Sequence, residues 1–86
     1  MDTTEIYNAA WNKWGDKQYI MLFEEMAELT KEISKHMRGK QNQTEIAEEI
    51  ADVQIMLDQM KLRFGKKQVE YFMDSKLARL EKLIQE

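Results

Sequence analysis

The chain has 86 residues, enough for a single domain, residues 1–86, with a modest hydrophobic core. It has no cysteine, which excludes disulfides and thiolate metal sites, and its net charge of −3 argues against binding to a nucleic-acid polymer. No apolar run could span a bilayer and no signal peptide is recognisable, so we expect a cytoplasmic protein without a membrane partner.

Proline is absent and only three glycines are present, at positions 15, 39 and 65. Glycine frequently follows the last turn of a helix, so these positions divide the chain into four segments. Abundant Glu, Lys, Leu, Met and Gln favour a helix in each segment. We therefore expect an all-α fold, a bundle of about four helices.

The four expected helices follow one another with short connections. Their approximate bounds are Thr4 to Trp14, Asp16 to Met37, Asn42 or Thr44 to Phe64, and Lys67 to Ile84. Asp16 is the expected N-cap of the second helix. Asn42, with Glu45 three residues later, has the pattern of a capping box at the start of the third helix.

The second helix carries apolar residues on two sides. Its main stripe, at helical spacing, consists of Leu22, Met26, Leu29, Ile33 and Met37, and a second strip consists of Ile20, Phe23 and Ala27. Three acidic residues, Glu25, Glu28 and Glu32, border the main stripe on one flank. The acids therefore lie next to the expected core, where burial would penalise their charges.

The third helix repeats this arrangement. Its main stripe consists of Ile46, Ile50, Val53, Leu57, Met60 and Phe64, and a further apolar side consists of Ala51, Ile55 and Leu62. Glu49 and Asp52 border the stripe. A helix that is apolar on two sides is usually buried between layers, and one short chain hardly supplies both layers. We expect a homo-oligomer, either a dimer or a tetramer.

The acids form two pairs at a spacing of three residues, Glu25 with Glu28 and Glu49 with Asp52. Residues three apart on a helix share a face, so two such pairs on facing helices would gather four carboxylates. A hard cation would relieve their repulsion, and Mg²⁺, with Mn²⁺ as a substitute, suits a site made only of oxygen ligands. The competing interpretation is a set of salt bridges to Lys or Arg of a partner chain.

The segments EEMAE (24–28) and EIAD (49–52) resemble the E-E-x-x-E … E-x-x-D signature of the MazG-like nucleotide pyrophosphohydrolases, which belong to the all-α NTP pyrophosphatase superfamily. Further segments are similar to short, often phage-borne members of this family: WGDKQ (14–18), RGK (38–40) and KLARLEKLI (76–84). The resemblance covers most of the chain and follows the family order.

The resemblance implies a specific reaction, the hydrolysis of a nucleoside triphosphate to a monophosphate and pyrophosphate. It implies Mg²⁺ ligation by the four acids Glu25, Glu28, Glu49 and Asp52. Glu28 or Glu49 is our candidate for the general base. Lys76 and Arg79 resemble the family's phosphate-binding positions, and the further candidates are Gln18 for nucleotide contact and Glu24 for orienting a ligand.

Two other interpretations of the function stay open at this point. The first is a non-catalytic helical module for oligomerisation or interaction, in which the acids bind a basic partner surface. The second is a nucleotide sensor that binds a triphosphate without turnover. Trp11 and Trp14 do not distinguish these interpretations, because a tryptophan in a small helical protein belongs to a core or a subunit interface more often than it stacks on a base.

Overall fold

The computed structural model describes all 86 residues and consists of four α-helices without a strand. The helices are α1 (Thr3–Trp14), α2 (Lys17–Met37), α3 (Gln43–Phe64) and α4 (Lys66–Ile84). The all-α prediction is confirmed, and the predicted bounds agree within about two residues, the usual uncertainty of a helix end. None of the four helices has both the length and the apolar character needed to cross a membrane.

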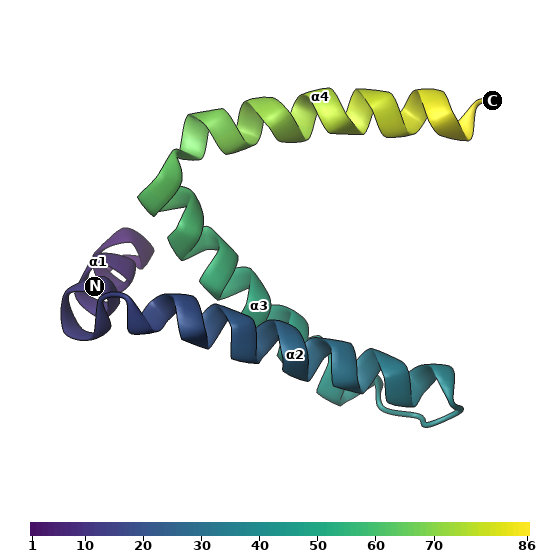
Figure 1. The fold of residues 1–86 in the computed structure, drawn as a ribbon, viewed down its shortest axis with the longest axis horizontal. Helices are drawn as coiled ribbons and strands as arrows, with labels where there is room; N and C mark the ends of the chain where they lie inside the picture. Colours follow the sequence, from purple (N-terminus) through teal and green to yellow (C-terminus); the bar gives the residue numbers. More distant parts are fainter.

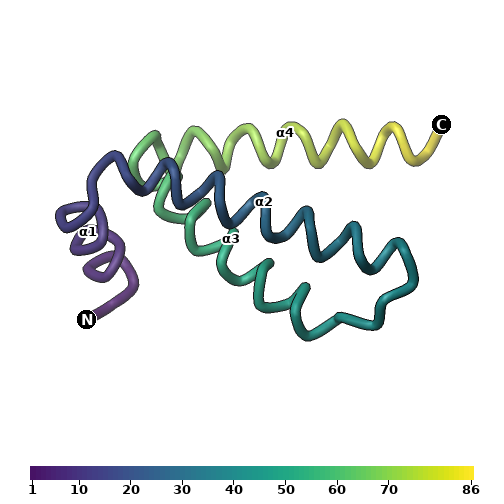
Figure 2. The backbone as a smooth tube through the Cα atoms, turned by 60° about the horizontal axis from the view of Figure 1, so that its bottom comes forward, coloured from purple at the N-terminus to yellow at the C-terminus, as the bar shows by residue number.

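The helices α2 and α3 form an antiparallel hairpin and make most of the contacts between elements (Figure 1). The short helix α1 crosses the open end of this hairpin. The helix α4 leaves the end of α3 at a sharp angle and runs in roughly the same direction as α2, but apart from it (Figures 1 and 2). The single residue Gly65 joins α3 to α4 with a φ of 125°, a backbone conformation that side chains with a Cβ rarely adopt.

The side chains of the two predicted N-cap residues do not cap their helices. Asp16 precedes α2 but has helical backbone angles and its side chain caps nothing, since a capping residue needs extended geometry. Asn42 precedes α3, yet its side chain makes no capping bond, so the predicted capping box with Glu45 does not form. An unpredicted cap exists at α1, where the Asp2 carboxylate accepts a hydrogen bond of 2.8 Å from the Glu5 backbone N–H.

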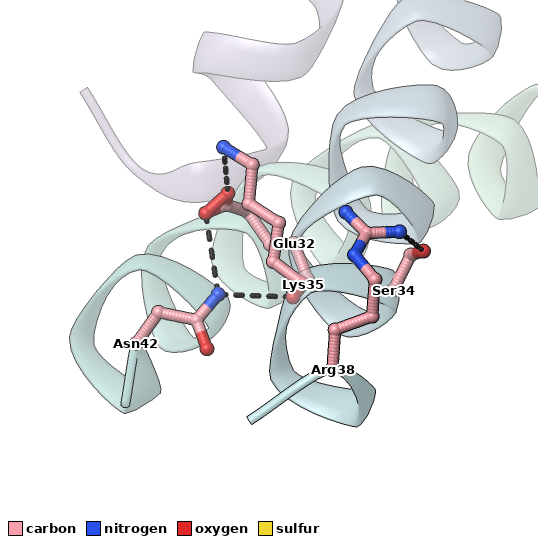
Figure 3. A network of polar contacts seen from close by, with 5 residues as sticks. All are labelled: Glu32, Ser34, Lys35, Arg38 and Asn42. Carbon is pink, nitrogen blue, oxygen red and sulfur yellow. Dashed lines mark hydrogen bonds and ion pairs between the residues drawn. The ribbon is translucent and has the colours of Figure 1, made fainter. Parts of the chain in front are cut away.

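Asn42 instead ties the start of α3 to the end of α2 (Figure 3). Its Nδ2 donates to the backbone carbonyl of Glu32 at 2.9 Å and to Glu32 Oε1 at 3.3 Å. Both residues are buried, and Lys35 Nζ lies 3.4 Å from Glu32 Oε2. Arg38 adds a hydrogen bond of 2.9 Å to Ser34 Oγ. A buried carboxylate is a strong acceptor, which explains why the amide binds Glu32 instead of capping α3.

This network leads to a prediction about how the stability of the protein depends on pH. Burial alone would raise the pKa of Glu32, but the hydrogen bonds from Asn42 and Lys35 outweigh it and hold the pKa below the ordinary 4.5. A lowered folded-state pKa means that the stabilisation is present above pH 4.5 and is lost as the pH falls through the folded-state pKa. Asn42→Ala should lower the Tm at pH 7 by roughly 5 °C, and this difference should shrink below pH 4.5.

Thermal melts at several pH values, at one protein concentration, check this prediction. Gln41→Ala is the matched control, since Gln41 is exposed and lies in the same loop. A Tm difference for Asn42→Ala that stays constant down to pH 3 would show that the hydrogen bond to the Glu32 carboxylate adds nothing to the stability of the fold.

The contact between α2 and α3 is a seam in which polar and apolar residues alternate. Buried or half-buried residues of the seam recur every three or four positions: Gln18, Leu22, Glu25, Leu29 and Glu32 on α2, Asn42 just before α3, and Ile46, Glu49, Val53, Met56 and Met60 on α3. The predicted main stripe of α2 is therefore partly wrong, because Met26, Ile33 and Met37 are exposed. The helix is rotated so that two of its acids, Glu25 and Glu32, enter the seam.

The single chain buries very little of itself. Only 6 of 86 residues are buried, and only Val53 and Met56 among them are apolar. The radius of gyration is 15.8 Å, compared with roughly 12 Å for a compact domain of this length. The accessible surface is 7029 Å², roughly 1,600 Å² more than a compact monomer of this mass exposes.

Candidate metal centre

The hairpin brings three of the four predicted metal ligands together. Glu25 on α2 meets Glu49 and Asp52 on α3, and one carboxylate oxygen of each lies within 4.8 Å of the other two. Glu25 and Glu49 are half-buried in the seam, whereas Asp52 is exposed. The cluster is therefore closed on the side of the helix pair and open to solvent at Asp52.

The three carboxylates repel one another in a partly dry environment. Burial raises the pKa of Glu25, and the nearby charges of Asp52, Glu49 and Glu28 and a hydrogen bond with Asp52 raise it further. Burial also raises the pKa of Glu49, with added repulsion from Asp52, Glu28 and Glu32. Both shifts follow from placing like charges together away from water.

No basic residue of the chain relieves this repulsion. The chain contains one ion pair, between Lys35 and Glu32, which lies outside the cluster. Glu49 Oε2 is buried and has no hydrogen-bond partner, a state that normally costs free energy. Three carboxylates, one with an unsatisfied buried oxygen, fit a hard divalent cation such as Mg²⁺, which takes oxygen ligands and retains waters and phosphates.

The other two candidate site acids of α2, Glu28 and Glu24, lie outside the close group. Glu28 is exposed, but it is near enough for its charge to raise the pKa values of Glu25 and Glu49. Glu24 is exposed as well and takes no part in the cluster. The geometry therefore separates a close set of three carboxylates from one neighbouring carboxylate that remains in contact with water.

A pocket of about 200 Å³ adjoins the carboxylates. Helices α1, α2 and α3 all line it, through Ala10, Trp14, Gln18, Met21, Glu25, Asp52, Ile55, Met56 and Gln59. Apolar and aromatic side chains form much of the wall, with a few polar groups, as is usual for a small-molecule site. A ligand in this pocket would lie directly beside Glu25 and Asp52.

Gln18 and Gln59 form a buried amide pair in this pocket. Gln18 is 1% exposed, and its Nε2 donates to Gln59 Oε1 at 2.7 Å. Gln59 Nε2 in turn contacts Met56 Sδ at 3.6 Å. Gln59 was not predicted from the sequence, although it follows Asp52 by seven residues, a spacing that returns to the same face of a helix.

The predicted phosphate-binding residues are not brought to the carboxylates within one chain. Lys76 and Arg79 are exposed on α4, which diverges from α2 and α3 (Figures 1 and 2). Neither residue forms an ion pair. Any contact between these cations and a ligand at the cluster would have to involve the α4 helix of another chain.

No protein-family model, curated protein or solved structure matches this chain. What the site can do therefore follows from its own residues. Three close carboxylates suit a divalent cation, and the adjoining pocket is lined by Trp14, Met56 and the amide pair. A ligand that joins a ring to a chain of phosphates would engage both parts of the site.

Proposed function

We propose that this protein is a MazG-like nucleotide pyrophosphohydrolase, which hydrolyses nucleoside triphosphates between the α and β phosphates to monophosphate and pyrophosphate in the presence of Mg²⁺. The observation that carries this proposal is the convergence of Glu25, Glu49 and Asp52 within 4.8 Å without a basic partner. The E-E-x-x-E … E-x-x-D spacing and the pocket beside the carboxylates support it.

The residues divide into ligands and a proton acceptor. Glu25, Glu49 and Asp52 would hold the Mg²⁺ ion, or Mn²⁺ in its place, with Glu28 at the edge of the set. The ion would neutralise phosphate charge and favour attack by water at neutral pH. Of the two candidates for the general base, the exposed Glu28 is better placed than Glu49, because Glu49 is committed to the close group.

The same proposal includes a homo-oligomer. The chain exposes roughly 1,600 Å² beyond the surface of a compact monomer, an area per subunit that is typical of an obligate interface. The helix α4 contributes to this surplus, since none of its residues is buried. In the assembly, α4 of a neighbouring subunit would carry Lys76 and Arg79 to the phosphates, where the arginine fork suits phosphate oxygens.

Pyrophosphate release from a panel of ribo- and deoxyribonucleoside triphosphates tests the function. We expect release from at least one triphosphate with Mg²⁺, and loss of release when EDTA is in excess. Triphosphate binding without any product would instead favour a nucleotide sensor. Neither binding nor product, at a protein concentration that keeps the assembly intact, would favour a non-catalytic oligomerisation module.

A further inference from the structure

A second groove lies between α1 and the C-terminal half of α3. It consists of two adjoining pockets of about 480 and 290 Å³, which share Tyr7 and Leu62. None of the carboxylates of the candidate metal centre lines it. This α1–α3 groove is therefore separate from the pocket beside the metal centre, apart from Gln59, which lines both.

One end of the α1–α3 groove offers a planar surface and amide groups. The Arg63 guanidinium carbon lies 4.5 Å from the centroid of the Trp11 ring, and Tyr19 packs against the same ring at 5.3 Å. Tyr19 and Arg63 thus both hold the indole in place, and the guanidinium covers part of its face. Asn8 and Asn12 line the same pocket with exposed amides. Flat stacking surfaces and amides that both donate and accept suit a heterocyclic ring.

The other end of the groove is basic. Lys61 and Lys66 line the smaller pocket together with Asp58, the only acid of the groove, and Arg63 lines the larger pocket beside Trp11, in a chain whose net charge is −3. The one ion pair of the chain lies elsewhere, so none of these three cations is paired with a carboxylate. Asp58 accepts a hydrogen bond of 3.0 Å from Gln54. Three cations without carboxylate partners in one groove favour an anion, and a stacked arginine keeps its N–H edge free for phosphate oxygens.

Two hydroxyl groups and a phenol complete the basic end. Thr3 and Thr4 of α1 line the smaller pocket beside Lys66. The Tyr7 phenol lies beside them, and burial, the charge of Asp58 and a hydrogen bond with Asp58 raise its pKa. Hydroxyl donors together with lysines are the groups that commonly bind phosphate oxygens in proteins.

We propose that the α1–α3 groove is a second ligand site, which binds a nucleoside monophosphate with its ring beside Trp11 and Arg63 and its phosphate toward Lys61 and Lys66. The ligand class follows from the two ends of the groove, one flat with amides and one basic. The site requires no metal ion and none of the metal-centre carboxylates. It therefore does not depend on the proposed hydrolase activity.

The test uses tryptophan fluorescence in EDTA, which prevents metal-dependent binding at the carboxylates. Trp14→Phe leaves Trp11 as the only tryptophan, and Trp11 lines the groove. Titration with AMP and UMP should change its emission saturably. Inorganic phosphate and the free nucleosides, which each lack one half of the ligand, should bind at least roughly tenfold more weakly, since each loses about 1.4 kcal/mol or more.

Charge-neutralising variants locate the site. Lys66→Gln and Arg63→Gln should weaken binding of the monophosphate about tenfold, as measured by calorimetry in EDTA. Lys67→Gln is the matched control, because Lys67 is exposed in the same helical turn but lines neither pocket. Lys66→Gln keeps the test valid if Arg63→Gln disturbs Trp11. Glu49→Gln should bind as the parent does.

Three results would overturn the proposal. The first is the absence of a saturable change in Trp11 emission with either monophosphate. The second is an equal loss of affinity in Lys66→Gln and Lys67→Gln, which would indicate only a general electrostatic attraction. The third is inorganic phosphate binding as tightly as the monophosphates, because the ring end of the groove would then contribute nothing.

Discussion

Glu49→Gln should lower pyrophosphate release at least roughly 100-fold, a loss of about 2.7 kcal/mol of transition-state stabilisation, while raising the Tm of the metal-free protein. The first effect follows from the loss of a ligand at the centre of the carboxylate cluster. The second follows from the loss of a charge that the fold buries without a partner. A variant that is more stable and inactive is the expected outcome for a residue kept for function.

The pH dependence of stability also tests whether Glu25 and Glu49 destabilise the metal-free fold. The folded-state pKa values of Glu25 and Glu49 are raised above the ordinary 4.5, so the unfolded chain loses these protons first. The metal-free protein should therefore lose stability as the pH rises from about 4.5 through the raised folded-state pKa values. Glu49→Gln should reduce this loss.

Adding Mg²⁺ should reverse the loss in the parent protein only. Saturation at 100 times Kd would add about 2.7 kcal/mol to the stability of the parent at pH 8, and little to that of Glu49→Gln. Glu45→Gln is the control, since Glu45 is exposed in the first turn of α3 and outside the cluster. If the metal-free Tm of Glu49→Gln fell instead, Glu49 would be a structural acceptor and the metal-centre interpretation would be wrong.

Leu80→Asp should break the assembly into smaller species and lower the Tm by roughly 10 °C or more at micromolar concentration. Leu80 is 51% exposed in the single chain, and α4 carries a row of similar residues: Phe72, Met73, Leu77, Leu80 and Leu83. Burying an unpaired carboxylate in an apolar interface costs several kcal/mol. Sedimentation velocity and melts at two protein concentrations measure both effects.

Ser75→Asp is the matched control for Leu80→Asp. It adds the same charge to the same helix, but five residues away along α4, which places it on the opposite side. It should leave the sedimentation of the protein unchanged. A parent chain that sediments as a folded monomer at micromolar concentration would contradict the proposed assembly.

Mixing two inactive variants would show whether α4 serves the site of a neighbour. Glu49→Gln lacks a metal ligand and Arg79→Ala lacks a phosphate-binding group, and each should be inactive alone. In a mixed dimer, one site would receive Glu49 from one chain and Arg79 from the other, so a 1:1 mixture should regain on the order of a quarter of the parent activity. No recovery after unfolding and refolding together would indicate that both groups act within one chain.

The helix bounds could be predicted from the sequence because they depend on local backbone chemistry. Gly15, Gly39 and Gly65 all have positive φ at helix ends, where few other residues fit. The side-chain caps could not be predicted in this way. Asn42 has the residue type of a cap, but Glu32 lies ten residues earlier and only the folded hairpin brings it within hydrogen-bond distance.

The carboxylate cluster was predictable because two regularities combine. A spacing of three residues places acids on one helix face, and a short turn makes consecutive helices antiparallel. The register of the seam was harder to predict, because α2 is apolar on two sides and periodicity does not say which side the chain itself covers. Met26 and Ile33 are consequently exposed, whereas Glu25 and Glu32 enter the seam.

The direction of α4 depends on the single residue Gly65 that connects it to α3. The helix has 19 residues, which at 1.5 Å per residue is a rod of roughly 28 Å, and the dihedral angles of one residue set its direction. A change of about 20° at this joint would move the tip of the rod by roughly 10 Å. Small changes in the backbone angles of Gly65 would therefore change which neighbouring surface α4 reaches. Exchange of α4 between subunits would require no change in the α2–α3 hairpin.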